Sequence, residues 1–323
     1  MEEAKLIPFD EWEHQRVALK DVNIHLRYAG RGPPLLLVHG VPQFSLTWHT
    51  IGPILAQTFT VIAVDTRGAA QSTIPRDNDY SASTCAEDLK GVLDFLNITE
   101  VYAFSHDKGV AATAALALKY PSLIKAVGFS EYALPGFGYE QFWNPSSSPN
   151  GWDLNANWQL AFFSVPEAAQ FFFQGREREM LIWFFYHASY AGNSSISQDH
   201  LDRYTRELTK PGFLRSSFEY YSGTNTIAKD NAFFTEMVRE RPLAQPIIVL
   251  GGEASIAPVS VLQSLFGEIG RDITYDIIPK AGHWIGDENP RWTADRLVKF
   301  FTEQENTPIS VDLSYLKDVV SLV

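Results

Sequence analysis

The chain has 323 residues, of which 45% are hydrophobic, enough apolar material for one large domain or for a domain with an insertion. A formal net charge of −12 argues against a basic surface for nucleic acid or an anionic membrane, and no apolar run is long enough to span a bilayer. The single cysteine, Cys85, excludes an intramolecular disulfide framework, and the charged N-terminus lacks a signal-peptide core, so we expect a reducing, cytoplasmic location.

The first predicted elements form an antiparallel hairpin, because apolar and polar residues alternate on both sides of Lys20-Asp21. Continuous apolar runs, typical of strands buried on both faces, follow at residues 34–40, 60–68, 101–104, 124–131, 246–250 and 273–278. Helical patterns lie between most of them, at residues 46–55, 85–96, 110–120, 260–266 and 291–301. This alternation predicts an α/β fold with a doubly wound, mostly parallel sheet.

Residues 132–245 interrupt the alternation, because they contain no convincing strand and are dense in aromatic side chains. We interpret them as a helical lid, or cap, inserted into a core made of residues 1–131 and 246–323. The last part of that core, residues 308–323, is either a final helix or a packing arm. A pocket between lid and sheet would be apolar, as small-molecule sites usually are. We therefore predict a small-molecule substrate as the partner, expect neither nucleic acid nor membrane, and leave a homodimer open.

The stretch around Asp107 has the pattern of a nucleophile elbow. An apolar strand ends in the turn Ser105-His-Asp-Lys-Gly109, and an Ala-rich helix follows directly. The central side chain is a carboxylate, which can attack carbon and form an ester intermediate. Asp is also a favoured N-cap residue, so the local pattern alone fits a purely structural role for Asp107 as well.

Two other loops carry candidate catalytic groups. His39-Gly-Val-Pro42 follows the first strongly buried strand, where the backbone N–H of Val41 and that of Lys108 could form an oxyanion hole. His283 follows the last strand and precedes the last helix. A histidine in such a loop, last in chain order, is well placed as a general base, although a lone histidine is more often structural.

Together, the motifs His39–Pro42, Asp65–Gly68, Ser105–Gly109 and Gly282-His283 resemble those of the α/β-hydrolase superfamily, in particular its epoxide hydrolase and dehalogenase branch with an Asp nucleophile. The resemblance covers nearly the whole chain. It implies the α/β-hydrolase fold with an inserted cap, a covalent intermediate, and chemistry that needs no metal or other cofactor. The loop Gly68-Ala-Ala-Gln-Ser72 departs from the usual pattern, because its second glycine is missing.

The resemblance leaves two candidates for the acid of the catalytic triad. Many relatives carry an Asp where this chain has Ser255. Fluoroacetate dehalogenases and one bacterial epoxide hydrolase group instead place the acid after the strand that follows the elbow helix, which corresponds to Glu131. We predict the triad Asp107, His283 and Glu131, with Glu253 as the alternative acid.

The predicted lid contains segments similar to those of the same epoxide hydrolase group. By this resemblance Tyr221 hydrogen-bonds the epoxide oxygen, with Tyr220 as the competing choice, and Trp158 and Gln159 lie at the substrate. Gln159 stands where a histidine partner is usual, and a glutamine amide can donate a hydrogen bond but cannot act as an acid.

A small haloacid fits the sequence less well than an epoxide as the substrate. The two arginines and the tryptophan that fluoroacetate dehalogenases use for the substrate carboxylate and halide are replaced by Lys108, Ala111 and Leu160. The sequence therefore predicts a hydrolase that opens an epoxide on an apolar small molecule to a diol through an ester on Asp107. The alternatives are a tailoring cyclase or isomerase, or a dehalogenase, on the same scaffold, and a ligand-binding receptor with decayed catalysis.

Overall fold

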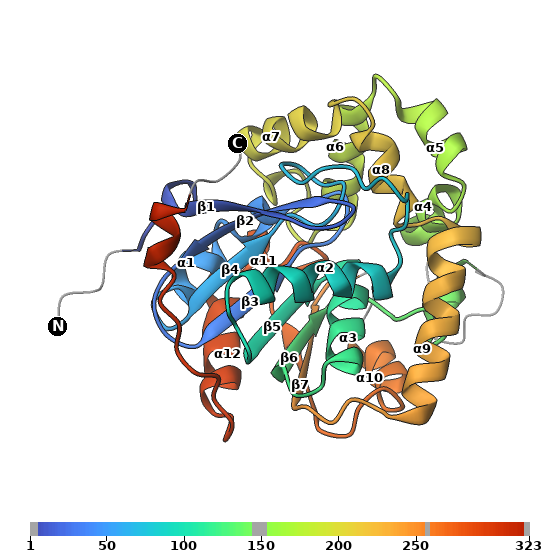
Figure 1. Ribbon diagram of the computed structural model, residues 1–323. Coiled ribbons are helices and arrows are strands. Elements are labelled where there is room, and N and C mark those ends of the chain that lie inside the picture. Colours follow the sequence, from blue (N-terminus) through green and yellow to red (C-terminus); the bar gives the residue numbers. More distant parts are fainter. Residues whose placement is uncertain (1–5, 144–153, 256–258, 320–323) are drawn as a thin grey trace.

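The computed structural model describes residues 6–143, 154–255 and 259–319 (Figure 1). Its centre is an eight-stranded sheet with the strand order β1-β2-β4-β3-β5-β6-β7-β8. The strands are β1 Glu13–Ala18, β2 Asn23–Ala29, β3 Pro34–Val38, β4 Thr60–Val64, β5 Val101–His106, β6 Ile124–Ser130, β7 Ile247–Gly252 and β8 Ile273–Ile278. β2 is antiparallel to β1 and β4, and every other neighbouring pair is parallel. The predicted α/β architecture and terminal hairpin are therefore confirmed.

The central strands are buried on both faces, as their apolar runs predict. Every residue of β3, β4 and β5 is buried. The same expectation for β8 is wrong, because β8 is the last strand of the sheet and most of its residues are partly or fully exposed. Ile277, for example, is 55% exposed. An apolar run does not reveal whether another strand or helix will cover it.

Helices cover both faces of the sheet (Figure 1). α2 Ala82–Phe95 and α3 Gly109–Lys119 pack against each other, as do α1 Ile51–Leu55 and α12 Pro290–Thr302. α10 Val259–Phe266 and α11 Ile285–Glu288 complete the core. Nearly all of α3 is buried, because its small side chains allow the helix to approach the sheet closely. α3 begins directly after β5, so this packing fixes the turn between them.

Only helices and connecting loops occur between β6 and β7 in the described part of residues 132–245, which we call the helical insertion; its residues 144–153 lie outside the described residues. The helices are α4 Leu154–Phe163, α5 Pro166–Phe173, α6 Glu177–His187, α7 Gln198–Leu208, α8 Phe213–Glu219 and α9 Ala228–Glu240. They form the upper and right-hand part of Figure 1. The backbone N–H of His283 donates to the carbonyl of Ala188, 2.8 Å away, so the insertion contacts the loop after β8.

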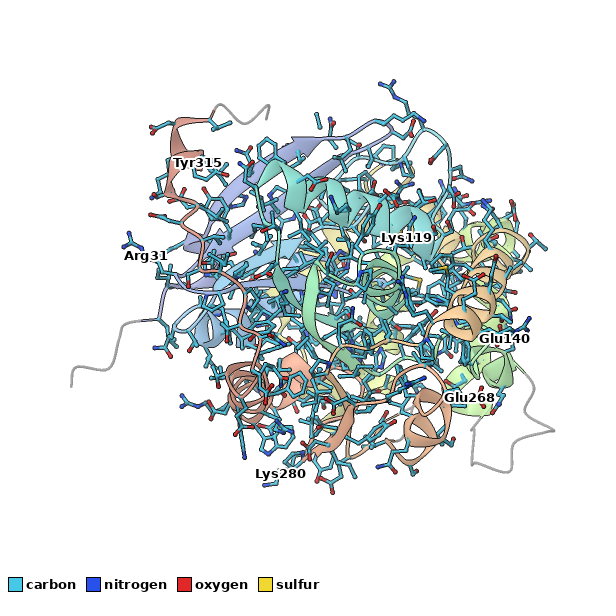
Figure 2. The ribbon with its side chains drawn as sticks, turned by 60° about the horizontal axis from the view of Figure 1, so that its bottom comes forward. Arg31, Lys119, Glu140, Glu268, Lys280 and Tyr315 are labelled. Carbon is cyan, nitrogen blue, oxygen red and sulfur yellow. The ribbon has the colours of Figure 1, made fainter. Side chains whose placement is uncertain are left out.

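The described part of the tail is a packing arm with one short 3-10 helix, Ser314–Asp318. Val311 forms an isolated bridge with Gly32, and Leu313 and Leu316 are buried. Charged side chains such as Arg31 and Lys280 lie at the margin of the molecule (Figure 2). A helix long and apolar enough to cross a membrane does not occur in the residues that the structure describes.

Candidate active site

Asp107 lies in the turn between β5 and α3, where the chain reverses sharply. Its φ of 48° falls in the left-handed region that residues other than glycine seldom adopt. The loop after β3 passes so close that a Cβ atom on Gly40 would lie 2.3 Å from the Cβ of Asp107. Glycine at position 40 is therefore required, and the Asp107 side chain is held against this loop. Backbone strain of this kind is common where a side chain must be presented to a substrate.

One oxygen of the buried Asp107 carboxylate accepts a hydrogen bond, and the other faces His283. Its Oδ1 accepts a hydrogen bond of 2.9 Å from the backbone N–H of Val41. Lys108 is the N-cap residue of α3, so its own N–H lies at the positive end of that helix. The second oxygen, Oδ2, lies 3.7 Å from Nε2 of His283, and the side chain retains 12% exposure. One oxygen is thus fixed by the loop, and the other faces the imidazole.

His283 is oriented by a buried carboxylate. Its Nδ1 lies 3.1 Å from Oε2 of Glu131. The same oxygen also accepts a hydrogen bond of 2.6 Å from the Ser255 hydroxyl. The other Glu131 oxygen accepts a hydrogen bond of 2.7 Å from the backbone N–H of Gly252 at the end of β7. A carboxylate held by these donors keeps the imidazole proton on Nδ1, so the lone pair on Nε2 points toward Asp107. The Trp284 ring packs edge-on against His283, with 4.6 Å between centroids.

Glu253, the alternative acid, lies elsewhere. It is exposed, and its carboxylate accepts a hydrogen bond of 2.8 Å from the backbone N–H of Lys280. Lys280 is at the edge of the molecule in Figure 2. The structure therefore brings Glu131, and not Glu253, to His283. Ser255, at the position where many relatives carry the acid, supports Glu131 with its hydroxyl, a contact that the sequence did not indicate.

The two neighbouring tyrosines after α8 face different surroundings. The Tyr221 hydroxyl donates to the carbonyl of Val41, 3.2 Å away, whereas the Tyr220 hydroxyl donates to the carbonyl of Arg67, 2.8 Å away. Burial and the nearby negative charge of Asp107 raise the pKa of Tyr221 well above its usual value. Tyr221 is thus a protonated donor beside the loop that holds Asp107, and its contact with a substrate oxygen stays a prediction.

The side chain of Lys108 is a feature that sequence reasoning missed, because only its backbone N–H was considered. Its Nζ donates to the hydroxyls of Tyr139, 2.8 Å away, and Tyr132, 3.3 Å away. It also lies 4.3 Å from the centroid of the Tyr221 ring. Burial lowers the pKa of Lys108 to about 7. The available signal was a lysine directly after Asp107, in a chain with tyrosines just beyond the next strand.

The remaining predicted substrate residues lie on α4. Gln159 is buried, whereas Trp158 is 38% exposed. Trp158 borders a cavity of about 410 Å³ in the helical insertion. The cavity is lined by Trp158, Phe162, Phe163, Phe172, Phe173, Arg176, Glu179, Met180 and Trp183. The Phe163 ring also lies 5.3 Å from that of Tyr221. Phe163 thus lies between the cavity and Tyr221, while Trp158 packs against Phe162 and Trp183.

Comparisons with known proteins identify the scaffold. A family model described as the alpha/beta hydrolase fold matches residues 33–290. The chain belongs to this family. It is 25% identical to the soluble epoxide hydrolase of Corynebacterium sp. (strain C12), over 90% of this chain and 98% of that protein. Epoxide hydrolase 2 of Caenorhabditis elegans is 24% identical, over 92% of this chain and 82% of that protein.

A solved structure gives the same result for the fold. The crystal structure of Cfl2 from Burkholderia cenocepacia superposes with a TM-score of 0.80 at 26% identity, covering 89% of this chain and 95% of that one. The predicted α/β-hydrolase fold and the predicted resemblance to epoxide hydrolases are therefore confirmed. The roles of the individual site residues remain predictions.

Proposed function

We propose that this α/β-hydrolase opens epoxides on apolar small molecules to diols through an ester on Asp107. The observation that carries the proposal is the position of the Asp107 carboxylate, in the elbow between the Val41 N–H and the Nε2 of His283. A carboxylate in this place can act as a nucleophile toward carbon. The Corynebacterium and Caenorhabditis relatives are named epoxide hydrolases, which supports an epoxide as the substrate.

In the first step, the Asp107 oxygen that does not contact Val41 attacks an epoxide carbon. A carbon–oxygen ester bond forms and the epoxide carbon–oxygen bond breaks. The departing alkoxide takes a proton from Tyr221, whose phenol is protonated because burial and Asp107 raise its pKa. Gln159 cannot supply this proton, so its amide contributes at most a hydrogen bond. Ring opening therefore depends on Tyr221 as the donor.

In the second step, water attacks the ester carbonyl while His283 removes one of its protons. The backbone N–H groups of Val41 and Lys108 stabilise the negative charge that develops on the carbonyl oxygen. Glu131 stabilises the imidazolium ion that forms, since it contacts the opposite ring nitrogen. The tetrahedral intermediate then breaks down, and the diol leaves as its oxygen takes the proton from His283. The proton of the resulting Asp107 carboxylic acid restores Tyr221, and the carboxylate is regenerated.

The aromatic cavity of about 410 Å³ in the helical insertion is the region that would accommodate the remainder of the substrate. Its lining is almost entirely apolar, so burial of a hydrocarbon or aryl group there is favourable. Phe163 lines the cavity and its ring lies 5.3 Å from that of Tyr221, so a substrate that extends from this cavity to the reacting atoms requires the Phe163 side chain to move. We therefore expect aryl and long-chain alkyl epoxides to react faster than small polar ones.

A His283→Gln variant tests the proposal, because it retains the nucleophile but lacks the base for the second step. Mixed with a panel of aryl and alkyl epoxides, it should gain the mass of one substrate molecule, and peptide mapping should place the adduct on Asp107. His283→Gln combined with Asp107→Asn is the control and should gain no mass. An adduct on another residue, or none with any epoxide that the wild type consumes, would contradict the ester mechanism.

Turnover in oxygen-18 water separates hydrolysis from the cyclase or isomerase alternative. Hydrolysis through an ester introduces solvent oxygen into Asp107 and, over many turnovers, into the diol. A cyclisation by a hydroxyl of the substrate itself leaves the product unlabelled.

A further inference from the structure

Three potential metal ligands from separate parts of the chain meet outside the catalytic site. His49 directly follows the 3-10 helix Ser45–Trp48, His200 is in α7 of the helical insertion, and Asp287 is in α11. One ligand atom from each lies within 4.8 Å of the other two. We propose that these three residues bind a divalent transition-metal ion, with Zn²⁺ as the best match, which links the insertion to the hydrolase core.

The orientation of His49 fits a metal ligand. Its Nδ1 lies 2.9 Å from the carbonyl of Leu46 and donates to it, which leaves the lone pair on Nε2. Metal-binding histidines are usually held in this way by a hydrogen bond from the other ring nitrogen. The Nε2 lies 3.9 Å from Oδ1 of Asp287, too far for a hydrogen bond. With metal–ligand bonds of about 2.0–2.1 Å, tetrahedral zinc brings its ligand atoms to about 3.3 Å, so a small side-chain movement suffices.

Asp287 supplies a second, independent observation. Its side chain is only 5% exposed, and its Oδ2 is a buried oxygen without a hydrogen-bond partner among the described residues. A buried carboxylate oxygen without a partner is costly, unless a cation or a donor offsets the loss of hydration. A metal ion bound by His49 and His200 would supply that positive charge.

The donor set indicates which class of ion would bind. Two imidazoles and one carboxylate, with a water molecule as the fourth ligand, suit Zn²⁺ better than Mg²⁺ or Ca²⁺, which prefer oxygen. The His49 and His200 rings are 3.8 Å apart between centroids. Arg203, one turn after His200 in α7, would oppose a cation, but its guanidinium is paired with both oxygens of Asp10, 2.7 and 3.1 Å away.

The position of the site indicates a structural role. Asp287 lies four residues after His283, in the helix that begins just after the loop of His283. The carboxylate of the neighbouring Glu288 accepts hydrogen bonds from the backbone N–H groups of Gly282, 2.6 Å away, and Ala191, 2.8 Å away. A metal ion bridging His200 to Asp287 would add a further connection between the insertion and this loop. None of the three ligands contacts Asp107, so the ion would stabilise the fold without taking part in the reaction.

The test uses full-length protein without a histidine tag, stripped with a chelator and titrated with Zn²⁺ by calorimetry. The wild type should bind about one ion per chain, and His200→Gln and Asp287→Asn should each weaken binding by more than about tenfold. His187→Gln is the matched control, because His187 is an exposed histidine in the neighbouring helix α6. It should bind like the wild type.

Two further measurements separate loss of the site from loss of the fold. Zn²⁺ should raise the thermal unfolding midpoint of the wild type and of His187→Gln but not of the two ligand variants, whose midpoints in chelator should stay close to that of the wild type. Co²⁺ should give the strong visible absorption of a tetrahedral site only in the proteins that bind Zn²⁺. Equal binding by the wild type and Asp287→Asn, or no binding by the wild type, would overturn the proposal.

Discussion

The ammonium nitrogen of Lys108, the residue after Asp107, lies 4.3 Å from the centroid of the Tyr221 ring. A cation over the face of an aromatic ring is attracted to it, and more strongly where water is excluded. In the proposed reaction Tyr221 gives its proton to the departing oxygen and becomes negative. A positive charge at this distance would stabilise that phenolate, so the side chain of Lys108 is a candidate positioning group for the donor.

Replacement of Lys108 by methionine tests this relationship. Because burial lowers the pKa of Lys108 to about 7, the ammonium form is present below this pH and is lost above it. In a His283→Gln background, the rate of ester formation should therefore fall as pH rises through about 7. Lys108→Met should be slower by about tenfold at low pH, the loss expected for a desolvated cation–aromatic contact, and lack this pH dependence. Stopped-flow tryptophan fluorescence measures the rate.

The same variant should change stability in a defined pH window. The pKa of Lys108 is lowered from 10.5 to about 7 by burial, so its contribution is fully present above the unfolded value and is lost as pH falls toward about 7. The free energy of unfolding of the wild type relative to Lys108→Met should thus decrease between pH 10 and pH 7, as measured by urea denaturation. A constant difference across this window would show that Lys108 keeps an ordinary pKa.

The two acidic candidates can be compared directly, because each can be changed to glutamine. Glu131→Gln removes the charge that stabilises the imidazolium form of His283 and should slow ester hydrolysis by about 10²–10⁴-fold, while ester formation changes little. Glu253→Gln alters only an exposed contact with the backbone of Lys280 and should hydrolyse the ester at the wild-type rate. Quenched-flow mass spectrometry reports both rates. The opposite result would restore Glu253 as the acid.

Local sequence patterns predicted the sheet, the elbow and the order of the catalytic loops well, because each depends on contacts that follow strand and helix periodicity. Asp107 and Glu131 directly follow the parallel strands β5 and β6, and His283 lies in the loop after the parallel strand β8, so their meeting at the carboxyl edge of these strands follows from topology. The exposure of β8 could not be predicted from its sequence pattern, since burial of an apolar run depends on what packs against it.

Contacts between segments distant in the chain could not be predicted from the sequence, because they too depend on which elements pack together. The tyrosines that surround Lys108 come from the helical insertion, and the Ser255 hydroxyl reaches Glu131 across more than a hundred residues of chain. The meeting of His49, His200 and Asp287 likewise joins three elements that no sequence motif connects. Such sites depend on how the insertion docks on the core, which single-sequence periodicity does not specify.

The neighbouring tyrosines 220 and 221 provide a matched pair of phenylalanine variants. Tyr221→Phe removes the proposed proton donor and should slow ester formation by about 10²-fold, within the range for loss of a positioned acid. Tyr220→Phe removes a buried hydrogen bond to the carbonyl of Arg67 and should cost about 1 kcal/mol of unfolding free energy with little change in rate. Single-turnover kinetics and urea denaturation of both variants distinguish the roles. A slower reaction in Tyr220→Phe alone would reverse the assignment.

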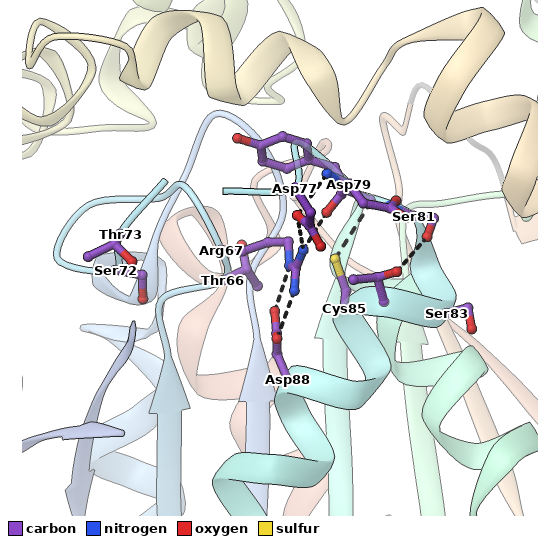
Figure 3. A network of polar contacts seen from close by, with 12 residues as sticks. Thr66, Arg67, Ser72, Thr73, Asp77, Asp79, Ser81, Ser83, Cys85 and Asp88 are labelled. Atoms are coloured by element: carbon purple, nitrogen blue, oxygen red, sulfur yellow. Dashed lines mark hydrogen bonds and ion pairs between the residues drawn. The ribbon is translucent and has the colours of Figure 1, made fainter. Parts of the chain in front are cut away.

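The loop after β4 is fixed to α2 by a buried ion pair (Figure 3). The Nε and one terminal nitrogen of Arg67 donate to both oxygens of Asp88, at 2.6 and 2.8 Å. The Arg67 and Asp88 side chains are only 3% and 10% exposed. Arg67 also donates to the carbonyl of Asp79, 2.5 Å away, and its own carbonyl accepts from Tyr220. The pair therefore connects the core, the loop and the helical insertion.

Removal of one partner of this pair should be strongly destabilising. Asp88→Ala removes the carboxylate that binds Arg67 through two hydrogen bonds and leaves only the more exposed Asp77, 3.3 Å away, as a counter-ion. The change should therefore lower the free energy of unfolding by up to about 3–5 kcal/mol. The matched control is Asp94→Ala in the same helix, because Asp94 is 61% exposed and pairs with Lys90 on the surface. That change should cost no more than about 0.5 kcal/mol, since exposed pairs are screened by water and salt. Urea denaturation of both variants measures the difference, and similar losses in the two would show that burial of the Arg67 pair does not determine its contribution.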